Sequence, residues 1–244
     1  MISRVTFESL TSSHLQSKGS DFIRRNEIYR SLGSGLPASD FAAMLSVSRA
    51  QLDQDVAALL ASGVKKGGYF VEFGATNGID LSNSYMLERE FQWTGILAEP
   101  SREWHHQLEL NRSASISHEA VWRETGKRLE FIESGELSTI GSFKESDGHK
   151  RTGRKYQVKT TTLRDLLVHF DAPSHIDFLS VDTEGSELDV LSAFDFGEYT
   201  FGFICVEHNF TPVRKEIKEL LESNGYSQLL SEVSGWDDWF VPAT

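Results

Sequence analysis

Short apolar runs alternate with helix-like stretches from Gly67 onward. The runs YFVEFG, TGILAEP, SISHEAVW, RLEFIES, IDFLSVDT and FGFICVEH each have the length and β-rich composition of a buried strand. Strands that alternate with helical segments predict a largely parallel sheet with helices on both faces. The pattern therefore predicts an α/β fold.

The last part of the chain breaks this alternation. The helix-like residues VRKEIKELLESNG are followed by two apolar runs, YSQLLSEV and DWFVP, with only a turn around Gly235 between them. Two strands joined by a tight turn are antiparallel. A mostly parallel sheet that closes with an antiparallel hairpin is expected of Rossmann-like class I methyltransferases, and a dinucleotide-binding dehydrogenase does not need it.

The first part of the chain is polar, and glycine and proline interrupt its small apolar clusters, which indicate short helices. The segment SRAQLDQDVAALLASG then predicts a helix with Ser48 as N-cap and Gln51 at the capping-box position. We therefore expect an N-terminal extension over residues 1–47 and one main domain over residues 48–244. The extension can complete a ligand pocket, mediate formation of a homodimer or cover an apolar face, and the sequence leaves these roles open.

Composition narrows the class of protein. The 244 residues include 36 acidic and 24 basic side chains, for a net charge of −12, which argues against a nucleic acid partner. Cys205 is the only cysteine and lies in an apolar run, so it cannot form an internal disulfide and suits a reducing compartment. The sequence shows neither a membrane-spanning apolar stretch nor a signal peptide, so we expect a cytoplasmic protein without a membrane partner.

The segment VEFGATNG predicts a ligand-binding turn. Small residues after an apolar strand let the backbone turn tightly and approach a ligand at the edge of the sheet. The spacing lacks one glycine of the G-x-G-x-x-G fingerprint, so a nucleoside amino acid fits better than a pyrophosphate. Glu72 can fix the ammonium of a bound methionine, and a simple strand-to-helix turn is the alternative. The expected cofactor contacts of the turn are Gly74, Ala75, Thr76, Asn77 and Gly78.

Glu99 ends the next apolar run and is followed by Pro100, which stops the strand. A carboxylate at this position can accept hydrogen bonds from both ribose hydroxyls of an adenosyl group. Ala120 and Val121 end the following run, where an adenine ring needs a flat apolar wall. The alternative for Glu99 is a solvated acid at the end of a strand.

Acidic residues end the two later strands. Asp182 and Glu184 in SVDTEGSE, and Glu207 and His208 in CVEHN, are expected at the same edge of the sheet. Repulsion between the acids can make one of them a base, or create a site for Mg²⁺ at Asp182, Glu207 and His208. His208 titrates near neutral pH and is the favoured base for an acceptor hydroxyl. Helix capping by Asp182 and a loop hydrogen bond from His208 are the alternatives, and the choice between a metal and a histidine base stays open.

The acceptor is expected to contact Asn83, Glu207 and Trp236. The connection from Glu133 to Tyr156 is long and polar, which is typical of a lid or binding loop. Its basic residues can meet a phosphorylated or carboxylated substrate, with a solvated loop as the alternative. These residues are Lys144, His149, Lys150, Arg151, Arg154 and Lys155.

Several segments together resemble the FkbM family of S-adenosylmethionine-dependent methyltransferases. The resemblance rests on GGYFVEFGATNGIDLSNSYMLE, GILAEPS, HEAVW, TTLRDLL, IDFLSVDTEGSELDVLSAFDF and WDDWFVP, and SRAQLDQD stands where the usual form is closer to SQxGQD. It implies transfer of a methyl group to a hydroxyl on a sugar, polyketide or related small metabolite, and it supports Asn83 and Glu184 as site residues. A nucleotide-dependent oxidoreductase and a non-catalytic binding module are the alternatives.

Overall fold

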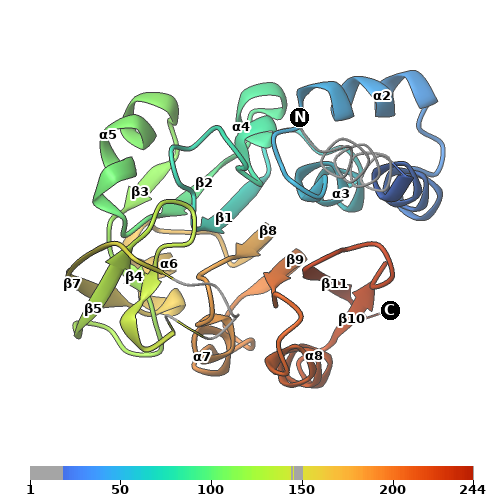
Figure 1. Cartoon of the computed structure of the whole chain (residues 1–244). Coiled ribbons are helices and arrows are strands. Elements are labelled where there is room, and N and C mark those ends of the chain that lie inside the picture. The colour runs from blue at the N-terminus through green and yellow to red at the C-terminus, as the bar shows by residue number, and fades with distance from the viewer. Residues whose placement is uncertain (1–18, 144, 146–150, 244) are drawn as a thin grey trace, which may run out of the picture.

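The computed structural model describes residues 19–143, 145 and 151–243, and a seven-stranded mixed sheet forms its centre (Figure 1). The strand order is β10-β11-β9-β8-β1-β2-β3. The predicted parallel sheet and the closing antiparallel hairpin are present. The run RLEFIES, predicted with the parallel strands, lies outside this sheet and pairs only antiparallel. The strands that pair in parallel are β1 (Tyr69–Phe73), β2 (Thr94–Ala98), β3 (Ser115–Ser117), β8 (His175–Val181) and β9 (Thr200–Glu207). Strand β11 (Asp237–Pro242) pairs antiparallel with both β9 and β10 (Tyr226–Leu229).

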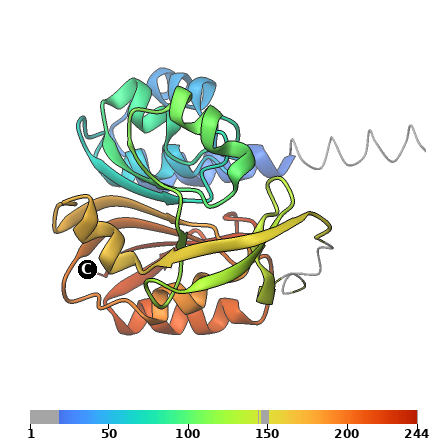
Figure 2. The ribbon, with the colours of Figure 1, turned by 90° about the vertical axis from the view of Figure 1, so that its left-hand side faces the viewer.

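Helices cover both faces of this sheet, as Figure 2 shows. Neighbouring side chains of β1 point to opposite faces, so Phe70 packs into one hydrophobic core and Val71 into the other. The core around Phe70 includes α3 (Gln54–Ala61), α4 (Tyr85–Phe91) and α5 (Arg102–Asn111), and the core around Val71 includes α6 (Leu163–His169), α7 (Glu187–Ser192) and α8 (Val213–Ser223).

No helix in the described part of the chain combines the length and apolar character needed to cross a membrane.

Short helices precede the main sheet. Residues 19–32 are helical, and α2 (Ala38–Val47) follows. Phe41 and Met44 of α2 are buried in the same core as α3, so these helices pack directly on the rest of the protein. The short helices predicted between residues 19 and 47 are therefore present, whereas the domain boundary at residue 47 stays a prediction.

The predicted helix start at Ser48 is wrong. Helix α3 begins at Gln54, because Asp53 adopts a left-handed conformation with a φ of +58°. Ser48 instead follows α2, where its N–H donates to Met44, and its hydroxyl donates to the buried Asp55 over 2.6 Å. Residues 48–53 thus form a connection whose polar groups donate to the side chains of Gln54 and Asp55 in α3, and they do not form a helical turn.

A second sheet of four strands lies beside the first, in the order β4-β7-β5-β6. The segment SISHEAVW, predicted as one strand, forms β3 in the main sheet and β4 in the second. The predicted long connection after Glu133 contains β6 and a short 3₁₀ helix. The strands are β4 (Ala120–Val121), β5 (Arg128–Glu133), β6 (Thr139–Ile140) and β7 (Arg154–Thr161), and the 3₁₀ helix is η1 (Gly141–Phe143).

Candidate functional site

A cavity of about 520 Å³ lies at the carboxyl ends of β1, β2, β8 and β9, between the main sheet and the second sheet. This is the edge at which α/β sheets place their ligands. Twelve of the residues that the sequence suggested for a site line this cavity. Those residues are Glu72, Gly74, Thr76, Asn83, Glu99, Pro100, Ala120, Val121, Asp182, Glu184, Glu207 and Trp236.

Four predicted site residues do not line this cavity. Ala75 is fully buried in the hydrophobic core. The side-chain oxygen of Asn77 accepts hydrogen bonds from the N–H groups of the two residues after Gly78, so it shapes the turn itself. The Gly78 carbonyl accepts a hydrogen bond from Arg112. His208 lines a separate, smaller cavity.

Gly74 brings the glycine turn against the acidic strand end. Its φ is +72°, and a Cβ atom at this position would lie 2.6 Å from the carbonyl oxygen of Asp182. Real Cβ atoms do not approach a backbone oxygen so closely, so only glycine fits here. The missing side chain therefore lets β1 and β8 end side by side.

The carboxylate of Glu72 is used inside the protein. It accepts hydrogen bonds from the Asn83 N–H at 2.8 Å and from the Ser82 hydroxyl at 3.0 Å, and the Ser84 hydroxyl also donates to it. A buried carboxylate needs such partners, since burying it unpaired is costly. Glu72 thus anchors the loop between the glycine turn and α4.

Arg112 completes this anchor. Its guanidinium is fully buried, lies 3.8 Å from the Glu72 carboxylate and pairs with Glu88 at 2.8 Å. It also donates to the hydroxyls of Ser82 and Ser84 at 3.0 and 2.8 Å. The guanidinium of Arg112 therefore holds the loop between the glycine turn and α4 in place.

Glu99 presents a carboxyl group with spare acceptor capacity. One oxygen accepts a hydrogen bond from the Thr76 N–H at 2.8 Å, and the other accepts one from the Ser101 N–H at 2.7 Å. Each carboxylate oxygen can accept a second hydrogen bond. Burial raises the pKa of Glu99 to about 7.

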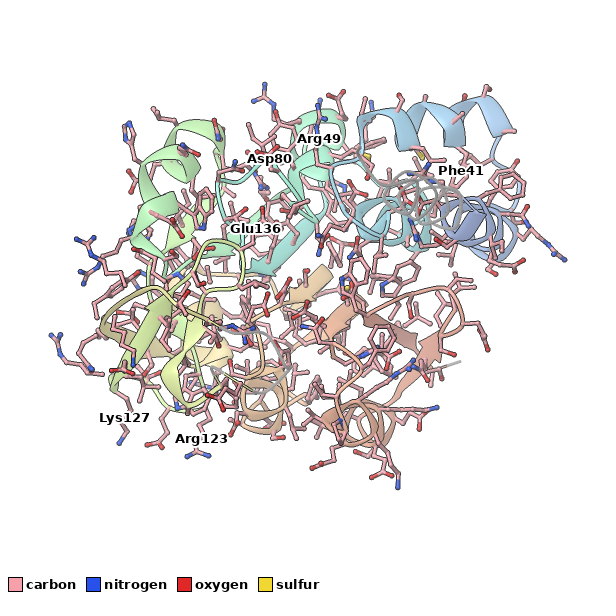
Figure 3. The ribbon with its side chains drawn as sticks, viewed as in Figure 1. Phe41, Arg49, Asp80, Arg123, Lys127 and Glu136 are labelled. Atoms are coloured by element: carbon pink, nitrogen blue, oxygen red, sulfur yellow. The ribbon has the colours of Figure 1, made fainter. Side chains whose placement is uncertain are left out.

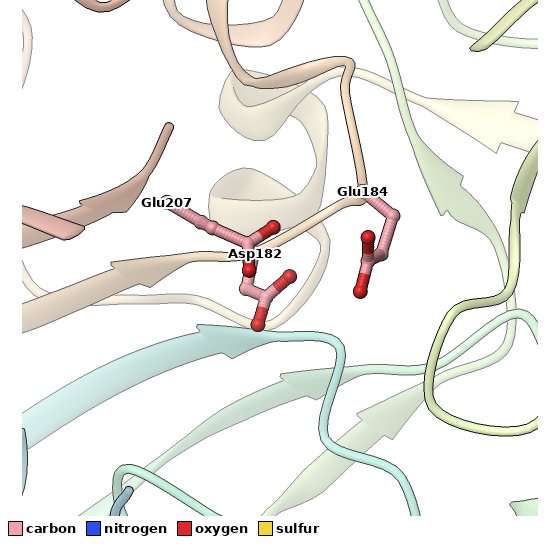
Figure 4. Close-up of side chains that lie close together, drawn as sticks. All are labelled: Asp182, Glu184 and Glu207. Atoms are coloured by element: carbon pink, nitrogen blue, oxygen red, sulfur yellow. The ribbon is translucent and has the colours of Figure 1, made fainter. Parts of the chain in front are cut away.

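Three acidic side chains meet on the other side of the cavity (Figure 4). Asp182, Glu184 and Glu207 each offer a carboxylate oxygen within 4.8 Å of the others. Burial, together with the facing carboxylates, raises the pKa values of Asp182 and Glu207, which share a hydrogen bond. Such a set can hold a proton between two carboxylates or bind a divalent cation.

Glu184 already has a cationic partner. Arg151, from the connection before β7, reaches its carboxylate at 2.6 Å, and the Arg151 guanidinium is fully buried. Arg151 also donates to the Leu137 carbonyl, which lines the cavity, at 2.6 Å. The ion pair therefore holds the connection after β5 against the end of β8.

The two other described basic residues of that connection, Arg154 and Lys155, do not line the cavity. Lys155 pairs with Glu130 at 3.0 Å on the second sheet, and Arg154 is exposed. Figure 3 shows Arg123 and Lys127, near the same sheet, pointing outward from the molecule. Lys144, His149 and Lys150 lie outside the described residues.

His208 has a different position from the one expected of a base. Its Nδ1 accepts a hydrogen bond from the Phe210 N–H at 2.9 Å, and its Nε2 lies 3.6 Å from Asp238. Because consecutive residues of a strand point to opposite sides, Glu207 takes the place in the cavity. The expected metal ligands Asp182, Glu207 and His208 are therefore not together, and Glu184 is the third neighbour.

Sequence reasoning missed residues that come from the connection before α3 and from β11. Gln51 and Gln54 line the cavity, and Gln54 donates to Asp237 at 2.6 Å. The helical pattern of QLDQD predicts these glutamines in the first turn of a helix. Two polar amide side chains so close together were the signal in the sequence that could have indicated a binding role.

The fold and the site together define an α/β protein with a ligand cavity at the carboxyl ends of its parallel strands. The family profile described as Methyltransferase FkbM domain matches residues 72–227. The chain belongs to this methyltransferase family, which confirms the resemblance.

Two solved structures are more distantly similar, and no curated protein matches the chain. A precorrin-6y C5,15-methyltransferase from Geobacter metallireducens is 10% identical with a TM-score of 0.42, over 77% of this chain and 85% of that one. A mutant of MtNAS is 9% identical with a TM-score of 0.37, over 94% of this chain and 72% of that one.

Proposed function

We propose that the protein is an S-adenosylmethionine-dependent O-methyltransferase that acts on a hydroxyl of a small molecule or glycan. One observation carries the proposal: a single cavity joins the carboxyl group of Glu99 to the Asp182 and Glu207 pair. A cofactor and an acceptor can therefore lie in contact. The strand order, with five parallel strands and a terminal antiparallel hairpin, is the one expected of Rossmann-like class I methyltransferases and supports the proposal.

The cofactor has a matching partner at each end in this proposal. The free acceptor positions of Glu99 receive the ribose hydroxyls. Pro100, Ala120 and Val121 offer an apolar wall to the adenine ring. Asn83 lies at the methionine end, and its side-chain oxygen is buried without a hydrogen-bond partner among the described residues. That oxygen can accept a hydrogen bond from the ammonium group, a role first expected of Glu72.

Asp182 and Glu207 serve as the base. With one proton shared between them, the pair carries one negative charge and can take up the proton of the acceptor hydroxyl. Bound S-adenosylmethionine would supply the methyl group to the hydroxyl oxygen and would leave as S-adenosylhomocysteine. The pair could also stabilise the positive charge of the cofactor before transfer. No covalent enzyme intermediate is required, and we place the reaction in the cytoplasm.

The test is calorimetric titration with S-adenosylhomocysteine at pH 8. We expect Glu99→Ala to weaken binding at least about tenfold, or about 1.4 kcal/mol, because the ribose loses its acceptor. Glu222→Ala serves as control, since Glu222 is a partly exposed acid on α8 outside the cavity. Wild-type protein that does not bind S-adenosylhomocysteine would overturn the proposal. A gain in melting temperature with NAD alone would favour the oxidoreductase.

A further inference from the structure

The described residues that line the cavity include no lysine, arginine or histidine. The buried guanidinium groups of Arg112 and Arg151 pair with acids at its edge but do not line it. An anionic group of an acceptor beside Asp182, Glu184 and Glu207 would face carboxyl oxygens in a medium of low dielectric, where repulsion is strong. The acidic lining residues are Glu72, Glu99, Glu136, Asp182, Glu184, Glu207 and Asp237.

Large apolar side chains line the same cavity and stay partly exposed. Phe210 is 70% exposed and Leu81 is 36% exposed, although both belong to residue types that normally seek burial. Trp236 also lines the cavity and is only partly buried. Aromatic and aliphatic side chains of this kind form the apolar walls of small-molecule pockets.

The backbone that carries these side chains is strained. Leu81, Asn209 and Phe210 have φ values of +62°, +44° and +56°. A left-handed conformation is unfavourable in such residues and persists where the surrounding structure imposes it. Strain of this kind concentrates at binding sites, because the fold holds a side chain where a ligand needs it.

His208 supplies part of that constraint. The Trp236 carbonyl accepts hydrogen bonds from the N–H groups of His208 at 2.9 Å and Asn209 at 3.2 Å. The imidazole of His208 accepts the Phe210 N–H and packs edge-on against the Phe210 ring, with ring centroids 5.5 Å apart. His208 is therefore a positioning residue that fixes two apolar side chains of the cavity relative to each other.

We propose that the acceptor is an uncharged hydroxyl compound with a flat apolar face, which packs against Phe210, and that anionic acceptors are excluded. The inference rests on the proposed function and specifies its substrate class. It also replaces the possibility of a phosphorylated or carboxylated substrate, because no lysine, arginine or histidine is among the described residues that line the cavity.

The test compares two probes that differ only in charge. Phenyl β-D-glucoside and phenyl β-D-glucuronide share a ring and a phenyl face, and the second carries a carboxylate. Binding to wild-type protein saturated with S-adenosylhomocysteine is measured by saturation-transfer NMR. We expect saturable binding of the glucoside and at least tenfold weaker binding of the glucuronide.

The variants test the apolar contact. Phe210→Ala is expected to weaken glucoside binding at least fivefold and to leave binding of S-adenosylhomocysteine unchanged. Leu110→Ala is the matched control, because Leu110 is 73% exposed on α5 and does not line the cavity. It is expected to change neither ligand's affinity.

Three results would overturn the inference: no saturable binding of the glucoside, glucuronide binding as tight as that of the glucoside, or equal losses in the two variants. Titration of S-adenosylhomocysteine on the same samples separates the two proposals. If that ligand binds and the glucoside does not, only the acceptor class is wrong. If that ligand does not bind, the proposed function itself fails.

Discussion

Gly74 shows how a single residue sets the distance between the cofactor turn and the acids. Its left-handed backbone and its contact with the Asp182 carbonyl both exclude a side chain. Gly63 has nearly the same φ, +71° against +72°, but open space where a Cβ atom would lie. Substituting the two glycines therefore separates the free-energy cost of a left-handed backbone from the cost of steric overlap.

We predict that Gly63→Ala lowers the free energy of unfolding by about 1 kcal/mol, the usual cost of a left-handed alanine. Gly74→Ala is expected to cost about 1–3 kcal/mol more, because β1 and β8 must move apart, and to weaken binding of S-adenosylhomocysteine. Urea unfolding and calorimetric titration of both variants give the comparison. Equal losses of stability would show that the contact with Asp182 is unimportant.

The sequence predicted which residues lie at the strand ends, but it could not predict which of their side chains point into the cavity. Glu99, Asp182 and Glu207 reach the cavity as expected, because each ends a parallel strand at the same edge. Glu207 and His208 are neighbours, so only one can face the cavity, and the register of β9 with β11 decides which. That register depends on long-range pairing that no local pattern contains.

At the scale of elements, Arg112 joins α5 to the loop between β1 and α4. Its guanidinium pairs with Glu88 and donates to Ser82 and Ser84 while fully buried. Removing one partner of a buried ion pair leaves the other charge unpaired, which is more damaging than losing an exposed pair.

We predict that Arg112→Met destabilises the protein by about 3–5 kcal/mol and reduces cofactor affinity, because Glu72 and Glu88 lose their cation. Arg164→Met is the control: Arg164 is 51% exposed and pairs with Glu198 at 2.7 Å on the surface. Its loss is expected to change the free energy of unfolding little, because water and salt screen an exposed ion pair. Chemical denaturation measures both, and similar costs would contradict the anchoring role of Arg112.

Long, strongly patterned elements could be predicted, and short ones could not. The central strands have continuous apolar runs, so their existence could be predicted from the sequence, whereas their order in the sheet could not. Strands β4 and β6 have two residues each, too few to show a period, and the second sheet was missed. The start of α3 was misplaced because Ser48 bonds to Asp55 across the connection rather than capping a helix.

At the scale of the whole molecule, buried carboxyl groups make stability depend on pH. Burial raises the pKa of Asp55 from 3.8 to about 7 and that of Glu99 from 4.5 to about 7. Each group therefore holds its proton more tightly in the folded protein than in the unfolded chain. Between pH 4 and 7 the folded state binds more protons, so the free energy of unfolding falls as pH rises. Burial also raises the pKa values of Asp182, Glu187, Glu207 and Asp237.

We predict a higher melting temperature for the ligand-free protein at pH 5.5 than at pH 8. Asp55→Asn is expected to reduce this difference, because the amide cannot ionise and keeps an oxygen for the Ser48 hydroxyl. Each kcal/mol corresponds to roughly 2–4 °C for a chain of this size. Calorimetric scans at the two pH values measure the effect. A melting temperature that rises with pH would contradict it.

The hydrogen bond from Gln54 to Asp237 joins residues 183 positions apart at the wall of the cavity. The site is therefore assembled from nearly the full span of the described chain. During synthesis on the ribosome, a chain that has not yet emerged as far as Asp237 lacks one wall of the cavity. The complete cavity is thus formed only after Asp237 has left the ribosome, rather than piece by piece.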